Sequence, residues 1–296
     1  MSNRIIRDVE FDYVIVDEAA KATFPELAVS LNKAHKIILV GDHQQLPPVL
    51  DTEIIRNNKE KLDEEGLAQG FFERMYNMFP EDNKHRLTIQ YRMHPTIGTL
   101  ISHVFYNDEI QNGVEAQDRE LCIEGYEGIA IEWISTSKYS TKERYEKEFD
   151  NNGKKSYQNY LERNIVERKL LELDSKLVKR TKVAVITGYG SQKYILQTMV
   201  KQHSFKHIEV DVDTVDAFQG SQKDIILYST VRSSGNKYGI GFLKSEARIN
   251  VAFSRARCLL IIVGDMKFLD NYKIRGNKFP EIIKYITESE LSLIHI

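Results

Sequence analysis

Apolar runs of strand length recur along the 296 residues, and they constrain the fold more than any other feature. Most are β-branched and nearly continuous, which is typical of parallel strands buried on both faces. Stretches with helical spacing lie between them, so the pattern predicts an α/β protein with right-handed crossovers. The strand-like runs are Tyr13–Val16, Lys36–Val40, Gly128–Ile134, Val183–Ile186, Ile225–Ser229 and Leu259–Val263, and the helical stretches are Leu67–Phe79, Pro95–Phe105, Leu161–Leu173, Gln192–His203 and Glu281–Glu290.

Composition excludes several classes of protein. The 41 Lys+Arg and 43 Asp+Glu nearly cancel, so binding of nucleic acid would need a local basic patch. Cys122 and Cys258 make neither a disulfide framework nor a zinc cluster. No apolar stretch approaches the roughly 18–20 residues of a membrane span. The start of the chain lacks the apolar run of a signal peptide, so we expect a cytoplasmic protein without a membrane partner.

The first apolar run ends in two adjacent carboxylates. Tyr13–Val16 leads into Asp17 and Glu18, which is the Walker B pattern. A strand tip places Asp17 where it can hold Mg²⁺ and Glu18 where it can deprotonate an attacking water. An acidic pair at a strand end is, by itself, more often a solvated turn.

The second run strengthens this interpretation. Lys36–Val40 leads into Gly41 and Asp42, and Gln45 follows in a polar turn. A glycine at this point permits a close approach of backbone to phosphate. Gln45 can sense a γ-phosphate or a water without adding charge. The two runs together predict a nucleotide site.

Arginines later in the chain supply the complementary charge. Arg92 precedes a predicted helix, and its guanidinium suits a developing phosphate charge, while Tyr91 beside it could stack on a base. Arg248, Arg255 and Arg257 lie on an apolar segment, where a buried arginine needs an anion. A carboxylate within the domain fits Arg248 or Arg257 well. Arg255 is the candidate for a second phosphate contact.

The ordered motifs resemble those of superfamily 1 helicases, in the group of the nonsense-mediated-decay and replication helicases. The resemblance runs from about Phe11 to about Leu269. It implies the tail of a first RecA-like P-loop domain followed by a complete second RecA-like domain. The matching segments are Asp17–Ala20, Gly41–Pro48, Gln90–Pro95, Val183–Gln192, Val215–Gly220 and Asn250–Arg257.

The resemblance also implies roles. ATP and Mg²⁺ would be the cofactors, Glu18 the base, Gln45 the coupling residue, and Arg92 and Arg255 two fingers. Hydrolysis between two RecA-like domains would drive movement along a single strand of DNA or RNA. The remaining ATP contacts would be Asp17 through Mg²⁺, Asp42, Tyr91, Gly220 and Gln222; the nucleic-acid contacts would be Thr187, Tyr189 and Thr214.

The expected domains are residues 1–85, from RecA-like domain 1, and residues 86–290, RecA-like domain 2. Residues 135–160 contain no Ile, Leu, Val or Met, and we expect an exposed loop or insertion there. Its tyrosines and lysines could stack on nucleic acid. Residues 291–296 match one reading frame of a sequencing adaptor and are set aside as a possible non-native tail, the alternative being an ordinary helix end.

One motif of the family is missing. A P-loop needs Gly-x-x-x-x-Gly-Lys followed by Ser or Thr, but the only Gly-Lys pair, Gly153-Lys154, is followed by Lys155. We therefore expect the P-loop region upstream in the same protein or on a separate chain, and poor ATP hydrolysis by this chain alone. Half of a split helicase and a non-catalytic nucleic-acid-binding module remain alternatives. Gln222 also departs from the family, which usually has Glu there.

Overall fold

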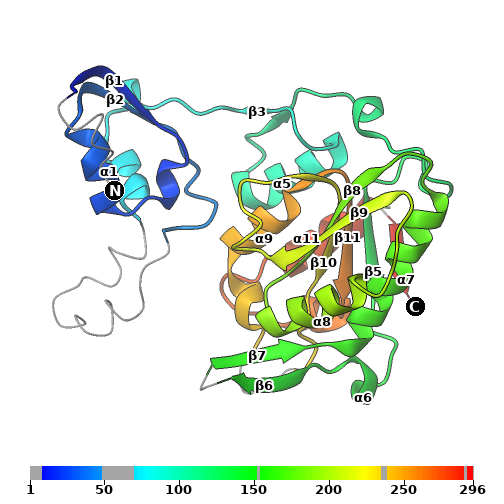
Figure 1. Ribbon diagram of the computed structural model, residues 1–296. Coiled ribbons are helices and arrows are strands. Elements are labelled where there is room, and N and C mark those ends of the chain that lie inside the picture. Colours follow the sequence, from blue (N-terminus) through cyan, green and yellow to red (C-terminus); the bar gives the residue numbers. More distant parts are fainter. Residues whose placement is uncertain (1–8, 49–69, 152–153, 235–238, 290–291, 296) are drawn as a thin grey trace. The chain divides into compact units, whose positions relative to one another are not determined.

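The computed structural model describes residues 9–48, 70–151, 154–234, 239–289 and 292–295, and the chain forms two compact units, Met1–Arg86 and Leu87–Ile296 (Figure 1). Each unit is described by itself. In the described residues no helix is long and apolar enough to cross a bilayer.

The first unit is built on a two-stranded parallel sheet in which Val16 pairs with Leu39. Thr23 begins the following helix through a capping box with Glu26, which satisfies backbone groups that the first turn leaves open. A small core of Ala19, Ala20, Leu27 and Phe72 packs beneath the sheet. Its elements are β1 (Phe11–Val16), the 3-10 helix η2 (Ala19–Lys21), α1 (Phe24–Leu31), β2 (Ala34–Leu39), α4 (Phe71–Met78) and η3 (Glu81–Asn83).

The second unit contains a six-stranded parallel sheet in the order β12-β5-β11-β10-β8-β9, next to two small two-stranded sheets. The α/β prediction is confirmed, and all six strand-like runs are strands. The strands of the large sheet are β5 (Ile131–Ser135), β8 (Thr181–Thr187), β9 (Ile208–Thr214), β10 (Lys223–Ser229), β11 (Ala256–Gly264) and β12 (Ser292–His295); the small sheets are β3 (Ile89–Gln90) with β4 (Gln111–Asn112) and β6 (Lys147–Asn151) with β7 (Lys154–Gln158).

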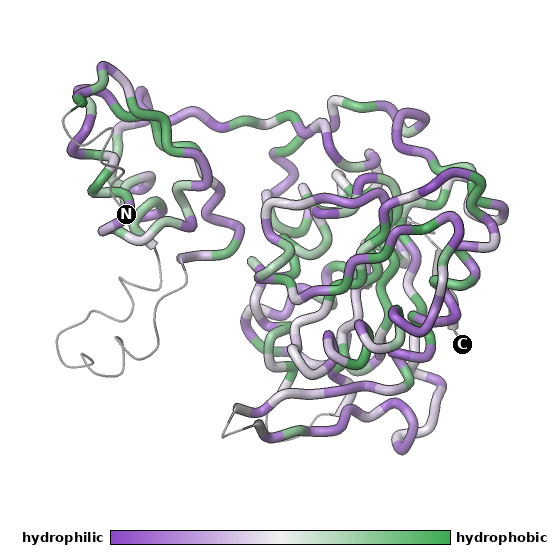
Figure 2. The backbone as a smooth tube through the Cα atoms, in the orientation of Figure 1, coloured by the Kyte–Doolittle hydropathy of each residue, from purple (hydrophilic) through white to green (hydrophobic). Residues whose placement is uncertain are grey.

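Helices cover both faces of the large sheet (Figure 1). On one face α7 and α8 bury residues such as Leu170 and Leu196 against Leu227. On the other, Phe253 of α9 packs edge-on against Tyr228, with ring centroids 5.4 Å apart. The hydrophobic stretches therefore concentrate on the central strands (Figure 2). The helices are α5 (Pro95–Tyr106), α6 (Thr141–Arg144), α7 (Tyr160–Lys176), α8 (Gly190–Val200), α9 (Glu246–Phe253), α10 (Met266–Asn271) and α11 (Phe279–Glu288), with η4 (Ala116–Arg119) and η5 (Gly241–Lys244).

Two segments have a form that the sequence analysis did not predict. Residues 135–160, expected to be an exposed loop or insertion, are largely exposed but are not a loop, because they form α6 and the antiparallel β6–β7 hairpin. Polar contacts bury the base of this hairpin: Glu146 pairs with Arg232 at 3.1 Å, and the Arg232 guanidinium lies 4.0 Å from the Tyr157 ring centroid. Hydropathy does not reveal burial of this kind. The tail segment Ser292–His295 pairs with β5 rather than continuing α11. Of the predicted helix Leu67–Phe79, residues 67–69 lie outside the described residues.

A second buried carboxylate closes the carboxyl end of β10. Glu162 is fully buried, and its two oxygens accept hydrogen bonds from the Val231 backbone N–H at 2.9 and 3.0 Å. Ser229 Oγ donates to it at 2.7 Å. Val231 has φ of 71°, a left-handed conformation that is costly for a β-branched residue. The Glu162 carboxyl group thus holds a strained turn in place. Burial raises the pKa of Glu162 to about 8, against the lowering effect of these hydrogen bonds.

We expect Glu162→Gln to change how the stability of the second unit depends on pH. Because the folded pKa is raised above 4.5, the folded protein binds this proton more tightly than the unfolded chain. Stability from this group is present below pH 4.5 and is lost as the pH rises towards 8. The Gln variant should lack this decline. Urea unfolding followed by fluorescence of Trp133, the single tryptophan, measures it; equal declines in both proteins would contradict the assignment.

Candidate functional site

The carboxyl ends of β1 and β2 bring Asp17 and Asp42 to the same edge of the first unit. The two backbone segments that follow these strands stay hydrogen-bonded to each other. The Val40 N–H donates to the Val16 carbonyl and the Ala19 N–H donates to the Val40 carbonyl, both at 2.8 Å. Residues that follow paired parallel strands leave the sheet side by side. Asp17 and Asp42 are therefore neighbouring acidic positions.

Glu18 has an unusual backbone conformation. Its φ of 55° and ψ of 33° lie in the left-handed region. Such a residue costs on the order of 1–3 kcal/mol and recurs at functional sites. Its N–H donates to Asp17 Oδ1 at 2.8 Å, and its half-exposed carboxylate lies 3.2 Å from Lys21 Nζ. The turn thus fixes Asp17 and leaves the Glu18 carboxylate accessible to solvent.

The segment after β2 is held by Asp42. Gln45 Nε2 donates to Asp42 Oδ2 at 2.7 Å, and the Gln44 N–H donates to Asp42 Oδ1 at 3.0 Å. A Cβ on Gly41 would lie 2.8 Å from the Ala20 backbone nitrogen. Within this unit Gly41 is therefore required by close packing against Ala20, which is a different reason from the approach to phosphate that the sequence suggested.

The donor set of this edge fits Mg²⁺ in part. Carboxylate oxygens are ligands that Mg²⁺ prefers, and it usually keeps several waters and binds substrate phosphates as well. Within the described ranges, no group of three or more His, Cys, Asp or Glu side chains gathers as a metal cage. Asp17 and Asp42 could therefore hold the ion only together with phosphate and water.

In the second unit, the two arginines predicted to contact phosphate meet at Ser254. Arg92 Nη1 donates to the Ser254 carbonyl at 3.3 Å, and Arg255 Nη2 donates to Ser254 Oγ at 3.2 Å. Arg255 is only 2% exposed, and its Nε donates to the Val251 carbonyl at 3.1 Å. Arg92 is half-buried. The structure therefore gathers both arginines, although only Arg92 is accessible.

The other predicted nucleotide contacts are exposed. Tyr91 is 62% exposed, and Gln222 lies on the surface immediately before β10. Gly220 has φ of 83° and open space where a Cβ would be, so its backbone conformation is the reason for glycine there. The Lys223 N–H donates to the Arg255 carbonyl at 3.1 Å. Gln222 and Arg255 therefore lie at the amino ends of adjacent strands.

The three predicted nucleic-acid contacts lie at the opposite, carboxyl edge of the same sheet. Thr187 and Thr214 end the paired strands β8 and β9. Thr214 is partly exposed, but Thr187 is fully buried and Tyr189 is 3% exposed. The Tyr189 ring packs edge-on between Tyr157 of the β6–β7 hairpin and Phe242, with centroids 5.3 Å from each. A surface contact through the ring of Tyr189 is therefore not available in this arrangement.

The remaining arginines have carboxylate partners, as expected. Arg248 Nε lies 3.1 Å from Asp216 Oδ1, and Arg257 Nη1 lies 2.9 Å from Asp224 Oδ1. Sequence reasoning missed Arg119, whose guanidinium donates to main-chain carbonyls near Arg92. No sequence signal identifies such a residue, because its acceptors are backbone carbonyls, which every residue has.

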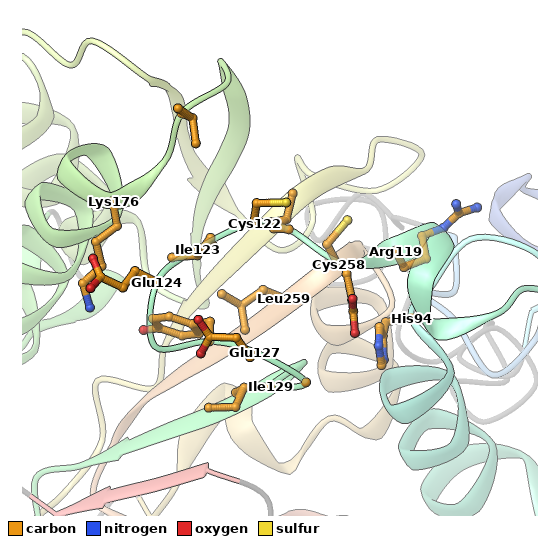
Figure 3. Close-up of a pocket in the computed structure, with 15 residues that line it drawn as sticks. His94, Arg119, Cys122, Ile123, Glu124, Glu127, Ile129, Lys176, Cys258 and Leu259 are labelled. Atoms are coloured by element: carbon orange, nitrogen blue, oxygen red, sulfur yellow. The ribbon is translucent and has the colours of Figure 1, made fainter.

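A cavity of about 480 Å³ lies beside the amino ends of β5 and β11 (Figure 3). His94, Cys122, Cys258 and Leu259 line it, and the Arg119 guanidinium points away from its centre (Figure 3). Burial raises the pKa of the Cys258 thiol to about 11, so it is protonated at neutral pH. Burial likewise lowers the pKa of His94. The cavity adjoins the arginine cluster, and its Cys258 thiol is not a reactive thiolate.

Acidic residues after β1 and β2, together with arginines gathered at the amino ends of β10 and β11, define a RecA-like α/β protein of the P-loop NTPase class. The chain belongs to the AAA domain family, whose model matches residues 67–267, and a second AAA domain model matches residues 1–53. The resemblance to superfamily 1 helicases of the nonsense-mediated-decay group is thereby confirmed.

Curated relatives agree with this family. The chain is 36% identical over 273 residues to a Regulator of nonsense transcripts 1 homolog of Neurospora crassa, with 90% of this chain and 24% of that protein covered. It is 36% identical to the ATP-dependent helicase NAM7 of Saccharomyces cerevisiae (88% and 26% covered) and 31% identical to an uncharacterized ATP-dependent helicase of Methanocaldococcus jannaschii (97% and 40%). The chain thus spans between 24% and 40% of these relatives' lengths.

We expect Gly98→Ala to destabilise the second unit. A Cβ there would lie 2.1 Å from Asn112 Oδ1 and 2.7 Å from Gln90 Nε2, two atoms that hydrogen-bond each other beside the arginine motif. Overpacking of this kind costs about 1–3 kcal/mol. The matched control is Gly190→Ala, where a Cβ meets nothing within 4 Å. Urea unfolding followed by Trp133 fluorescence compares them; equal midpoints would contradict the tight packing at Gly98.

Proposed function

We propose that this chain is the hydrolytic and strand-moving part of an ATP-dependent helicase or translocase acting on single-stranded nucleic acid. The meeting of Arg92 and Arg255 at Ser254, which lies 162 positions after Arg92, carries the proposal. Converging guanidinium groups at the amino end of a sheet suit a transferring phosphoryl group. A non-catalytic binding module would gain little from keeping Glu18 in a costly left-handed turn as well.

The first unit supplies the acid–base part of the mechanism. Asp17 and Asp42 would hold Mg²⁺, which supplies positive charge to the phosphate oxygens. Glu18 accepts the proton of the attacking water, because its carboxylate is accessible and fixed by the turn. Gln45 is oriented by its hydrogen bond to Asp42, and its uncharged amide contacts the γ-phosphate.

The second unit stabilises charge and holds the nucleotide. Arg92 interacts with the charge that develops on the transferred phosphoryl group. Arg255 is the second arginine that contacts the phosphates. To do so, its guanidinium must give up its hydrogen bonds to the Val251 carbonyl and to Ser254 Oγ. Exposed Tyr91 stacks on the base, while Gly220 and Gln222 face the phosphates and the ribose.

The nucleic-acid end of the same unit uses Thr214 as its accessible contact with the strand backbone. Thr187, paired with Thr214 on the neighbouring strand, and Tyr189 are buried, so they shape this edge. Contacts of this kind position a strand without reading its sequence. The Val215 N–H donates to the Thr187 carbonyl, and the connection Val215–Gln222 then returns to the amino end of β10. It thereby joins the strand contact to the nucleotide contact.

The proposal needs a P-loop, contributed by flanking residues of the same protein or by a separate chain. Substrate identity, DNA or RNA, is an outcome of the assay. The free thiols Cys122 and Cys258 suit a reducing compartment such as the cytoplasm.

We expect Glu18→Gln to lower kcat for ATP by about 10²–10⁴-fold, because a general base contributes that much and glutamine cannot accept the proton. Nucleotide binding should persist. The assay measures phosphate release, with and without single-stranded DNA or RNA, by the natural protein expressed with the residues that flank this chain in its gene. Glu10→Gln, at an exposed position, is the matched control. Near-normal turnover by Glu18→Gln would sink the assignment of the base.

A further inference from the structure

Among the described residues, Arg119 makes three hydrogen bonds, all to backbone carbonyls. Its Nε donates to the Arg92 carbonyl at 2.8 Å, its Nη2 to the Tyr91 carbonyl at 2.7 Å, and its Nη1 to the Asp118 carbonyl at 2.9 Å. Two of these acceptors belong to the turn that presents the exposed ring of Tyr91 and the guanidinium of Arg92. One planar fork therefore spans two consecutive peptide units of that turn.

The N–H groups of the same turn are held from the other side by Gln90. Its Oε1 accepts hydrogen bonds from the N–H groups of Arg92 and Met93, both at 2.8 Å, and its Nε2 donates to the Met93 carbonyl at 3.0 Å. The His94 N–H donates to the Arg257 carbonyl at 2.7 Å. Together with the bonds from Arg119 to the carbonyls of Tyr91 and Arg92, these contacts hydrogen-bond both N–H and carbonyl groups of the backbone from residue 91 to 94.

Arg119 is itself well placed by the fold. It ends η4, which follows β4, and β4 pairs in parallel with β3 immediately before the turn. The Tyr91 ring rests directly on Gly113 between β4 and η4, since a Cβ on Gly113 would lie 2.3 Å from the ring. The segment that carries Arg119 is thus fixed against the turn independently of the guanidinium.

We propose that Arg119 is a positioning residue for ATP hydrolysis, which fixes the Tyr91–Arg92 turn so that the Arg92 guanidinium is presented in one geometry. This inference rests on the proposed function. Arg119 acts through Arg92 and touches no reacting atom. Arg119 is partly buried, so the experiment below also measures whether its loss disturbs the fold. Orientation is the quantity it controls, and small displacements of a catalytic group cost up to about a hundredfold in rate.

The experiment is a double-mutant cycle in the natural protein, expressed with its flanking residues. We expect Arg119→Gln to lower kcat for ATP by about tenfold or more with KM little changed. Arg119→Lys should recover only part of the rate, because one ammonium cannot span both carbonyls. In an Arg92→Gln background, Arg119→Gln should have no further effect on kcat, since the guanidinium that it positions is gone. Arg180→Gln, a 75%-exposed arginine, is the matched control and should behave as the parent protein.

Hydrogen exchange separates positioning from loss of fold. In Arg119→Gln we expect faster exchange of the amides of Arg92 and Met93 and unchanged protection of the strands of the large sheet. Equal losses of kcat in the parent and Arg92→Gln backgrounds, or normal kcat in Arg119→Gln, would overturn the positioning role while leaving the proposed function intact. No ATP turnover by the parent protein would overturn the proposed function, and the positioning role with it.

Discussion

Parallel pairing of β10 with its neighbours β8 and β11 is the constraint on which the second unit depends. Because all strands of the large sheet run in one direction, the sheet has one amino edge and one carboxyl edge. Arg92, Arg255 and Gln222 gather at the amino edge, whereas Thr187 and Thr214 lie at the carboxyl edge. In the first unit the acidic residues follow the carboxyl ends of β1 and β2. Strand direction thus places the candidate phosphate contacts and the candidate nucleic-acid contacts at different edges of the sheet.

Buried polar groups, rather than aliphatic ones, hold the loops at the carboxyl edge of the sheet in the second unit. Glu162 fixes the strained Val231, and the buried pair of Glu146 with Arg232 ties the β6–β7 hairpin to the segment after β10. Buried ions are costly unless their hydrogen bonds are satisfied, so such contacts enforce one arrangement more than they add stability. The hairpin then covers Tyr189, which shapes the surface next to Thr214.

The sequence predicted those parts of the fold in which burial is apolar. The six continuous β-branched runs are all strands, since a strand buried on both faces has no polar alternation. Strand β9 was missed because its residues alternate apolar and acidic, as suits a strand at the edge of the sheet. The hairpin within residues 135–160 was not predicted because the buried residues around it, such as Glu146 and Gln158, are polar. Tyr189 and Arg119 show why the site could be predicted only in part. The sequence does not tell which aromatic ring packs on a tyrosine, or which carbonyls an arginine donates to.

The connection Val215–Gln222 has a mechanical consequence. It crosses from the carboxyl end of β9 to the amino end of β10, and its eight residues can extend to at most about 29 Å. The seven residues of β10 rise about 23 Å alongside it. The tether therefore has little slack, and part of that is taken up by the turn in which the Ser221 N–H bonds the Phe218 carbonyl. A displacement of Thr214 by several ångströms would therefore either open that turn or move Lys223, whose N–H donates a hydrogen bond to the Arg255 carbonyl.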